Sequence, residues 1–493
     1  MIVELRLQMI FNSVDFLIFF SIVFSIYFFI PQKFKWGFLL AASYFFYGYW
    51  KIEYLILLIV PTIIVYFISF KISQTQSKRR RKLLLILGVI AGLAVLLVYK
   101  YIDFIGSSLF SLAGIFISNL EYNPFNLLWP IGVSFYSFKL VSYLVDVYNE
   151  KSKAEKHLGY FALYVSFFPQ LLMGPIDRAV NFIPELKKKI YVDIDRVVSG
   201  FRLVVWGVFK KMVISDRLAI FVNEVFRDPE QQGINLIFGA YFYAFRIYCD
   251  FSGYSDIAIG ISRILGFKSM NNFDFPYFSK SMTQFWNRWH ISLSTWLRDY
   301  LFLPIAYAVM RPIKTPKLYR IKAETWGYVI GMFLTMFLGG LWHGARWTFV
   351  IWGMLHGIYL IVGYITKKTR KKWVKKTRLN KFPRLRYVIS VFITFNLVSF
   401  AWIFFRAESF DKALSYIKHL RFGSTGKGTV YLLFNLILVS IFILLEILYK
   451  NRKKLTFIRQ MPMVLKVVCF VFFICFTIIF AVDTSNEFIY LQF

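Results

Sequence analysis

Two histidines in apolar surroundings are the residues of this sequence best suited to chemistry. His343 lies in FLGGLWHGARW, and His290 lies among tryptophans and arginines in FWNRWHISLSTWLRDY. Ionisable groups inside apolar runs are costly unless they are partnered, which makes them candidates for function. An imidazole titrates near neutral pH and can take the proton of an attacking hydroxyl. Each histidine is therefore a candidate base, and a packed, hydrogen-bonded core residue is the alternative at both positions.

Three glycines surround His343 and remove side-chain bulk beside it. They are Gly339, Gly340 and Gly344. Without a Cβ, they would let a ligand or a second stretch of backbone approach closely.

The remaining histidines are weaker candidates. His356 follows His343 by thirteen residues, and on one unbroken helix it would sit about 220° further round. We therefore expect it to face away and to be structural. His157 at a loop edge and His419 in a charged outer segment are expected on solvated faces.

Other familiar arrangements of chemical groups are missing from the sequence. Arg246 and Asp250 are four residues apart and can pair on one helix face. Asp250 and Asp256 are six apart and point in different directions, which argues against a paired-carboxylate site. There is no metal-ligand spacing, nucleophile elbow or phosphate-binding glycine loop. The three cysteines lie in apolar runs, where small buried or lipid-facing side chains are expected: Cys249, Cys469 and Cys475.

The elements that must position these groups are membrane helices. The chain has 493 residues, of which 58% are hydrophobic and 21% aromatic, and its mean hydropathy is +0.57. A soluble domain of this size could not keep so much apolar surface from water. The formal net charge is +33, but the basic residues form short blocks between apolar runs, as at Ser77–Lys82 and Lys367–Lys376. Cytoplasmic loops of membrane proteins show this pattern, and it argues against nucleic-acid binding.

Twelve apolar runs are long enough to span a bilayer. They lie at about 15–30, 34–50, 53–70, 83–105, 126–148, 196–222, 233–265, 326–345, 347–365, 386–405, 429–449 and 464–482. Gly159–Pro175, with its prolines and glycine, and the charged, amphipathic Gln284–Tyr307 do not resemble simple spans. Such segments persist at membrane depth only inside protein or beside a wet cavity, so we predict that both are re-entrant or interfacial. The predicted fold class is an all-α polytopic membrane protein.

The basic loops also predict the topology. If Lys71–Lys82 is cytoplasmic, the three preceding spans put the N-terminus outside the cell. With both broken segments re-entrant, the other basic loops share the cytoplasmic side: Lys151–Lys156, Lys187–Lys189, Arg311–Lys322, Lys367–Arg386 and Lys450–Arg459. The C-terminus then lies outside, where Asp483 and Glu487 fit.

Four sequence words resemble one family. They are FPQLLMGPIDR (Phe168–Arg178), YCDFSGYSDIAIG (Tyr248–Gly260), FWNRWHISLSTWLRDYLFLPI (Phe285–Ile305) and LGGLWHGARWTFVIWGMLHG (Leu338–Gly357). In this order, and in a chain of this hydropathy, they resemble the membrane-bound O-acyltransferases. The resemblance is closest to the bacterial branch typified by alginate O-acetyltransferases, and it extends over nearly the whole chain.

The resemblance implies a fold and a pair of catalytic residues. The fold is a ring of about 11–12 tilted transmembrane helices with re-entrant segments around a central tunnel. It implies one membrane-embedded domain over 1–493, with its core motifs in about 130–365. The Trp-His-Gly word makes His343 the principal catalytic residue, and the Arg-Trp-His-x-Ser word makes His290 a second one. Arg288 and Trp289 become candidates for a donor channel, or equally for support of the tunnel wall.

The resemblance also implies substrates and partners. The donor is a cytoplasmic acyl thioester, acetyl-coenzyme A or an acyl carrier, with no permanently bound cofactor. The acyl group is passed towards an extracytoplasmic polysaccharide, with an SGNH-hydrolase-like acetyltransferase as partner on that side of the cell membrane. The acceptor polymer, acyl group and oligomeric state stay open.

The ending FIYLQF suggests a further step. It resembles aromatic-tyrosine endings of such acylation systems, in which the tyrosine accepts the acyl group in transit, and this makes Tyr490 a candidate acyl carrier. The expected family form has Phe in place of Leu491, so the match is imperfect. An interfacial aromatic anchor is the alternative.

Two other functions compete with polysaccharide O-acetylation. Within the same class, the chain could transfer D-alanine to teichoic acid from a carrier-protein thioester. From a different class, a polytopic transporter or flippase could line its substrate path with the same polar residues. Loss of acyl transfer in a His343→Ala variant would favour the enzyme.

Overall fold

A computed structural model gives the fold of this protein. It describes residues 9–117, 121–127, 130–231, 233–313, 317–318, 321–420, 429–451, 460–482 and 488–489. Within these ranges the regular structure is helical, apart from one small hairpin in which β1 (Lys317–Leu318) pairs antiparallel with β2 (Ile321–Lys322). The prediction of an all-α protein is confirmed. The chain divides into two compact units, one of residues 1–204 and 254–270 and the other of residues 205–253 and 271–493.

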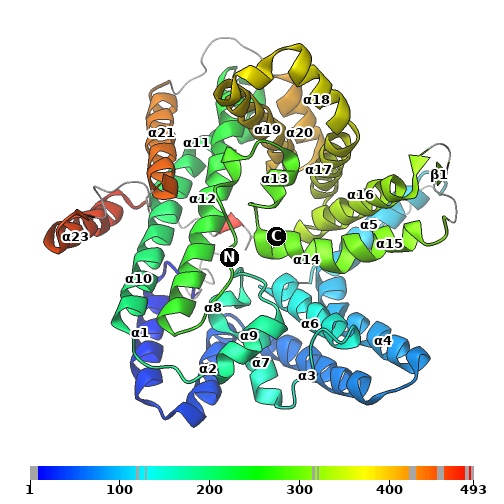
Figure 1. The fold of residues 1–493 in the computed structure, drawn as a ribbon, viewed down its shortest axis with the longest axis vertical. Helices are drawn as coiled ribbons and strands as arrows, with labels where there is room; N and C mark the ends of the chain where they lie inside the picture. Colours follow the sequence, from blue (N-terminus) through cyan, green and yellow to red (C-terminus); the bar gives the residue numbers. More distant parts are fainter. Residues whose placement is uncertain are drawn as a thin grey trace. The chain divides into compact units, whose positions relative to one another are not determined.

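The first unit contains the N-terminal helices, drawn from blue to cyan in Figure 1. They are α1 (Val14–Phe29), α2 (Gln32–Gly48), α3 (Ile52–Gln74), α4 (Lys78–Leu96), the π-helical turn η2 (Leu97–Tyr101), α5 (Ile102–Ala113), α6 (Val133–Tyr148), α7 (Leu158–Ser166), α8 (Phe168–Leu171) and α9 (Ala179–Lys187). α10 (Ile194–Val208) begins in this unit and α12 (Asn235–Ile264) ends in it. α6 is buried along most of its length between α3, α4 and α7, so it forms the core of the unit.

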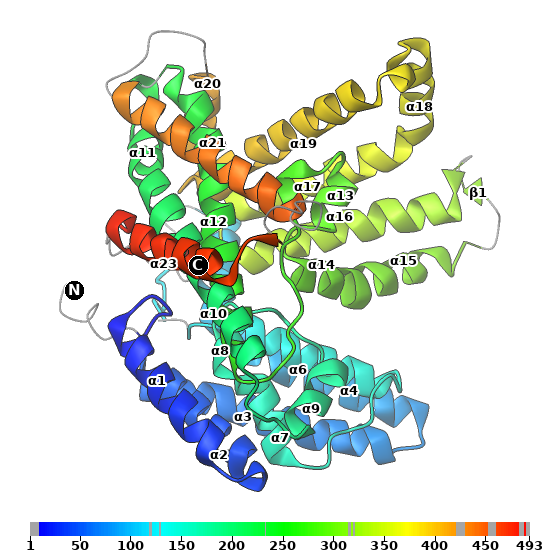
Figure 2. The same ribbon diagram turned by 60° about the vertical axis from the view of Figure 1, so that its left-hand side comes forward.

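The second unit contains most of the remaining helices. They are η3 (Phe209–Ser215), α11 (Asp216–Arg227), η4 (Pro229–Gln231), η5 (Pro276–Phe278), α13 (Met282–Trp286), α14 (Ile291–Leu297), η6 (Arg298–Phe302), α15 (Leu303–Met310), α16 (Ala323–His343), α17 (Trp347–Ile365), α18 (Lys367–Lys376), η7 (Leu379–Lys381), α19 (Pro383–Arg406), α20 (Phe410–Lys418), α21 (Thr429–Asn451) and α23 (Met463–Phe480). α16 packs closely against α15 and α17 (Figure 1). α21 and α23 pack on the π-helical turn η3 (Figure 2).

Seven helices among the described residues are long and apolar enough to cross a membrane. They are Ile52–Gln74, Lys78–Ala113, Ala323–His343, Trp347–Ile365, Pro383–Arg406, Val430–Asn451 and Met463–Phe480. Their outer faces carry large exposed apolar side chains, such as Phe472 and Ile479 on α23. A water-soluble protein would not expose such continuous apolar surface, and a bilayer covers it. The protein is therefore a multi-pass membrane protein.

All twelve predicted spans fall on helices, but five do not meet these criteria of length and composition. α1, α2 and α6 have only 16 or 17 residues. The stretch from α10 to α11 and α12 carry charged residues along their length. The fourth span continues to Ala113, eight residues beyond its predicted end, and α6 begins at Val133 rather than near 126. Pro130 and Gly132, the latter with a φ of 78°, keep the preceding residues out of the helix.

Both segments predicted to be broken are broken. α7 ends at Ser166, and α8 is a single turn of four residues before the chain continues without helix towards Asp177. Further along, α13 ends at Trp286 and α14 starts only at Ile291. Most side chains of Gly159–Pro175 are buried inside their own unit, and so are Phe285, Trp286, Trp289 and His290 at the second break, whereas η6 has no buried residue. Their irregular backbone is thus shielded by protein, as membrane depth requires.

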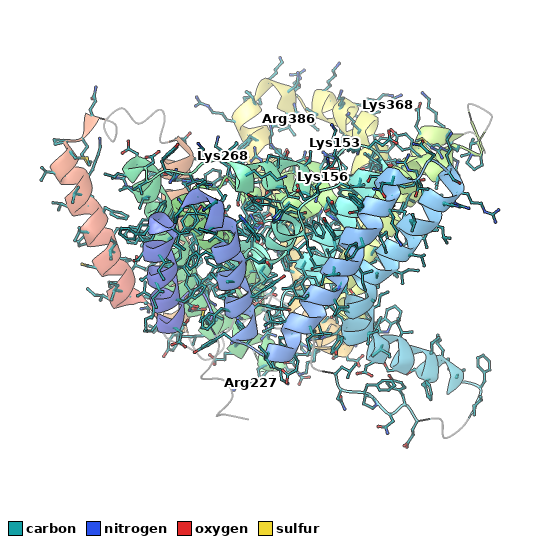
Figure 3. All side chains as sticks on the ribbon, turned by 90° about the horizontal axis from the view of Figure 1, so that it is seen from below. Lys153, Lys156, Arg227, Lys268, Lys368 and Arg386 are labelled. Carbon is teal, nitrogen blue, oxygen red and sulfur yellow. The ribbon has the colours of Figure 1, made fainter. Side chains whose placement is uncertain are left out.

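Most of the basic residues labelled in Figure 3 lie towards one edge of their own unit. In the first unit, Lys153, Lys156 and Lys268 share the upper edge of Figure 3. In the second, Lys368 and Arg386 lie at the upper edge and Arg227 at the lower one (Figure 3). Basic residues gathered at one edge are the distribution that the positive-inside rule associates with the cytoplasmic side.

Candidate active site

The helical hairpin of α16 and α17 presents His343 at its turn. Gly340 on α16 faces Gly353 on α17, and a Cβ added to Gly340 would lie 3.1 Å from the Gly353 Cα and 2.4 Å from the Phe349 carbonyl oxygen. The two backbones meet so closely because neither glycine has a side chain. Of the two uses predicted for the glycines beside His343, approach of a second backbone is therefore the one seen at Gly340.

The His343 ring is enclosed by aromatic side chains. It is the last residue of α16 and is only 4% exposed. Its ring centroid lies 4.8 Å from that of Trp342, 4.8 Å from that of Trp352 and 5.1 Å from that of Phe405. These rings exclude bulk water and fix the orientation of the imidazole.

His290 is fixed by hydrogen bonds rather than by rings alone. It caps the N-terminus of α14 with a φ of 42°, a left-handed conformation that non-glycine residues adopt only where their surroundings hold them. Its Nδ1 lies 3.2 Å from Asn272 Oδ1, and the same oxygen accepts from the Ser292 backbone N–H at 3.2 Å and from Ser292 Oγ at 2.7 Å. His290 is fully buried, with its ring centroid 4.6 Å from that of Phe251.

These bonds determine the tautomer of His290. A backbone N–H can only donate, so the Asn272 atom facing Ser292 must be the amide oxygen. An Nδ1 that faces this acceptor must carry the hydrogen. In the neutral ring the lone pair is then on Nε2, which is the arrangement of an oriented base or proton acceptor.

One tryptophan joins the two predicted catalytic histidines. The Trp342 ring centroid lies 6.0 Å from that of His290 and 4.8 Å from that of His343. The structure thus brings His290 and His343 together around one indole, although 52 residues lie between them in the sequence.

The donor-channel candidates have different surroundings. Trp289 is 1% exposed and packs against aromatic rings, including those of Phe285 at 5.5 Å and Trp402 at 5.2 Å. These contacts are those of a structural wall. Arg288 is half-buried, with its Nε 3.9 Å from Asp274 Oδ2. A role of either residue towards the donor stays a prediction.

His356 is a residue that the sequence interpretation misplaced. The expectation that it faces away from His343 is wrong, because α16 ends at His343 and α17 starts afresh at Trp347. The interruption between the two helices changes the direction in which the α17 side chains point. The ring centroids of His343 and His356 both lie 4.8 Å from that of Trp352. His356 is fully buried, and its two ring nitrogens have no hydrogen-bond partner among the described residues.

The Phe168–Arg178 word forms a separate polar network in the first unit. The Gln170 amide donates to Asp177 Oδ2 and to Ser269 Oγ, both at 2.7 Å. The Lys139 ammonium donates to Gln170 Oε1 and to the Tyr164 carbonyl, both at 2.9 Å. This network stabilises the broken segment α7–α8. It gives a structural reason for the polar residues of the Phe168–Arg178 motif.

The expected pairing of Arg246 with Asp250 is replaced by other partners. The Arg246 guanidinium donates to Asn223 Oδ1 at 2.8 Å. Asp250 instead forms an ion pair at 2.8 Å with Lys211, which lies on a different helix. Among the described residues, no three His, Cys, Asp or Glu side chains are grouped so that they could hold a metal ion.

The comparisons with known proteins agree with this geometry. The model of the membrane-bound O-acyltransferase family matches residues 153–410, a range that contains both histidines and all four quoted words. The probable alginate O-acetylase AlgI of Azotobacter vinelandii is 37% identical over 413 residues, 82% of this chain and 76% of that protein. This chain belongs to the membrane-bound O-acyltransferase family.

Two further relatives show the range of this family. The peptidoglycan O-acetyltransferase of Helicobacter pylori is 34% identical over 407 residues, 77% of this chain and 72% of that protein. The teichoic acid D-alanyltransferase of Streptococcus thermophilus is 32% identical over 293 residues, 56% of this chain and 68% of that protein. The membrane-bound O-acyltransferase described here is therefore an enzyme, and the resemblance to the alginate O-acetyltransferase branch is confirmed. Tyr490 lies outside both the matched range and the described residues.

Proposed function

We propose that this O-acyltransferase takes an acyl group, acetyl in particular, from a cytoplasmic thioester and passes it across the cell membrane for O-acetylation of an extracytoplasmic polysaccharide. The observation that carries the proposal is the pair of buried histidines around Trp342. The printed activities of the O-acetylating relatives, on alginate and on peptidoglycan, support an acetyl group and a polysaccharide.

His343 is the principal catalytic residue in this proposal. Its imidazole takes the proton from an acceptor hydroxyl while the hydroxyl oxygen attacks the thioester carbonyl carbon. The C–S bond breaks, an ester C–O bond forms, and the proton passes from the imidazole to the departing thiolate. General-base assistance of this kind is worth about 10²–10⁴-fold in rate.

His290 acts as the second catalytic residue. The bond to Asn272 holds its Nδ1 hydrogen, which leaves Nε2 as a fixed acceptor. In that state it orients the acceptor hydroxyl or relays its proton. When protonated it donates from Nε2 and can stabilise an oxyanion.

Donor, partner and orientation complete the proposal. The donor is acetyl-coenzyme A or an acyl carrier, bound from the side of the basic loops. An SGNH-hydrolase-like acetyltransferase completes transfer to the polysaccharide on the opposite side, where both chain termini lie. The positive-inside distribution supports this orientation.

Tyr490 is the acyl carrier between the two steps. A phenol, with a pKa of about 10, is a better leaving group than a sugar alcohol, so a tyrosine ester is an activated donor. An ester at this position would separate membrane crossing from transfer to the polymer, as covalent intermediates do.

The catalytic assignment is tested by comparing two histidine variants at equal membrane abundance. His343→Ala should reduce the O-acyl ester content of the cell-surface polymer to background. The matched control is His419→Ala, because His419 is part-buried on α20 and its Nδ1 contacts only its own helix in the bonds observed. Normal acylation by His343→Ala would refute the assignment, and mass spectrometry of the ester distinguishes acetyl from D-alanyl.

The carrier assignment is tested by Tyr490→Phe, which keeps the ring and removes the nucleophile. Polymer acylation should be lost, and the wild-type peptide around residue 490 should carry an acyl adduct in a mass spectrum. Full acylation by the Tyr490→Phe protein would make the tyrosine an anchor only.

A further inference from the structure

A buried ion cluster lies deep in the second unit, away from the rings around His343. The Lys211 ammonium bonds Asp216 Oδ1 at 2.9 Å and Asp250 Oδ1 at 2.8 Å. All three side chains are at most 6% exposed. Asp250 is near the middle of α12, about 20 Å from either end of the helix at 1.5 Å per residue. Charges at such depth are functional candidates.

Local backbone irregularity positions this cluster. Lys211 lies in the π-helical turn η3, between α10 and α11. π-Helical turns inside α-helices are common at functional sites. Gly253 lets α12 approach this turn, because a Cβ on Gly253 would lie 2.8 Å from the Gly207 carbonyl oxygen. A larger residue at 253 would push Asp250 away from Lys211.

The segment that follows α23 leads back to the cluster. The Arg217 guanidinium donates to the Phe480 carbonyl oxygen at 2.8 Å, and the Val482 N–H donates to the Met212 carbonyl oxygen at 3.2 Å. Met212 directly follows Lys211 in η3, and Arg217 lies at the start of α11, so the segment leaves α23 alongside η3 and α11.

Two residues of that segment reach the ions themselves. The Ile489 N–H donates to Asp250 Oδ2 at 2.7 Å. The Lys211 ammonium lies 4.5 Å from the ring centroid of Phe488. Phe488 is 0% and Ile489 4% exposed. Both residues are therefore enclosed by the protein.

Asp250 is the residue that joins the ions to the segment. It uses Oδ1 for Lys211 and Oδ2 for the Ile489 N–H, whereas Asp216 bonds the same ammonium without a bond to residues 488–489 in the bonds observed. The next residue of α12, Phe251, contacts the His290 ring at 4.6 Å. The point of attachment is thus one residue away from a contact of the second catalytic histidine.

We propose that Lys211 and Asp250 form a docking site for the chain's own residues Phe488 and Ile489, that Asp250 is the positioning residue of this site, and that docking is required for the transfer step proposed for Tyr490. This inference deepens the proposed function and rests on it for the role of Tyr490. Residue 490 directly follows the docked pair, and one residue advances the chain by at most about 3.6 Å. Release of the docked pair should therefore impair the acyl transfer proposed for Tyr490.

Docking itself can be measured without any acyl transfer. In a Cys469→Ser, Cys475→Ser background, Ile489→Cys keeps the backbone N–H and places a reporter thiol in the buried position. Its rate of maleimide labelling should be low, and Asp250→Ala should raise the rate roughly ten- to a hundredfold, as expected for loss of a hydrogen bond to a charged group. The matched control, Asp216→Ala, removes the other Lys211 partner and should raise the rate much less, because Asp216 has no bond to residues 488–489 in the bonds observed.

Two additional measurements guard against misfolding. Asp250→Asn keeps an oxygen that can accept from Ile489, so its labelling rate should lie between those of the parent protein and Asp250→Ala. In the unsubstituted protein, hydrogen exchange of the Ile489 amide should be slow. Fast exchange, or equal labelling of the Asp250→Ala and Asp216→Ala proteins, would overturn the docking site.

Acyl transfer in the same preparations separates this inference from the proposed function. Release of the segment together with loss of polymer acylation supports both. If Asp250→Ala releases the segment but acylates the polymer normally, the docking site stands and the proposed role of Tyr490 is refuted. No release in Asp250→Ala, with His343→Ala still inactive, would refute the docking site alone.

Discussion

The two broken segments, α7–α8 in the first unit and α13–α14 in the second, differ in how their polar atoms are satisfied. In α7–α8, the Gln170 side chain bonds Lys139, Asp177 and Ser269 within one closed network. Around α13–α14, Asn272 and Ser292 bond one another beside His290, but several polar atoms of nearby aromatic side chains differ from those of α7–α8. The indole nitrogens of Trp286 and Trp352, like both His356 nitrogens, are buried without a hydrogen-bond partner among the described residues.

The difference leads us to predict a structural role for α7–α8 and a chemical role for α13–α14. Buried polar groups in proteins are nearly always hydrogen-bonded, and a closed network such as that of Gln170 rigidifies its surroundings. Groups held in fixed positions with hydrogen-bonding capacity left over are those that can act on a substrate. We therefore predict that α13–α14, with the oriented His290, belongs to the active site and that α7–α8 has a structural role.

The largest effect that would sharpen this comparison is expected at His290. His290→Ala should lower acyl transfer by roughly a hundredfold, the lower range for a proton-transfer group, with membrane abundance unchanged. Asn272→Ala should have a smaller effect, because the ring remains but loses its oriented tautomer. Rates are measured at matched expression. If both variants are as active as the wild type, α13–α14 is structural as well and the contrast disappears.

Substitution of Gln170 in α7–α8 should lower stability rather than activity. Gln170→Ala leaves the Lys139 ammonium and the Asp177 carboxylate with one partner fewer, at a cost of about 1–3 kcal/mol per unsatisfied group. Thermal unfolding in detergent should show lower stability, while activity per folded molecule stays near that of the wild type. A stable Gln170→Ala protein without activity would place this segment in the active site.

The smallest effect is expected at His356. His356→Phe keeps a flat ring against Trp352 and removes two buried nitrogens, and replacing buried polar groups by apolar ones of similar shape is nearly neutral or stabilising. Acyl transfer should fall by less than about tenfold, because His356 does not contact His290 in the ring contacts observed. A loss as large as that of His290→Ala would add His356 to the catalytic residues.

Much of the fold could be predicted from the sequence, because each feature had a local cause. Apolar runs of sufficient length predict membrane helices, and the prolines and charges of Gly159–Pro175 and Gln284–Tyr307 predict their breaks. The candidate histidines followed from the cost of an imidazole in an apolar run and from the family words. Their meeting around Trp342 follows only from the tertiary structure.

The features that the sequence does not predict depend on helix interruptions and long-range contacts, which have no local sequence pattern. The predicted direction of the His356 side chain is wrong because α16 ends at His343 and a new helix begins after three intervening residues. Asp250 was paired with Arg246 by sequence spacing, yet its ion-pair partner is Lys211 on the π-helical turn η3. A π-helical turn and a contact with residues 488–489, more than two hundred positions away, cannot be derived from the spacing of charges.

The central claim is that His343 catalyses acyl transfer from a thioester to a hydroxyl. The most direct test supplies labelled acetyl thioester to sealed vesicles that contain the purified protein and measures hydroxylamine-sensitive ester in protein and acceptor. The account predicts that His343→Ala forms this ester at least about a hundredfold more slowly than the wild type, whereas His419→Ala matches the wild type. Ester formation by His343→Ala at the wild-type rate would contradict the account.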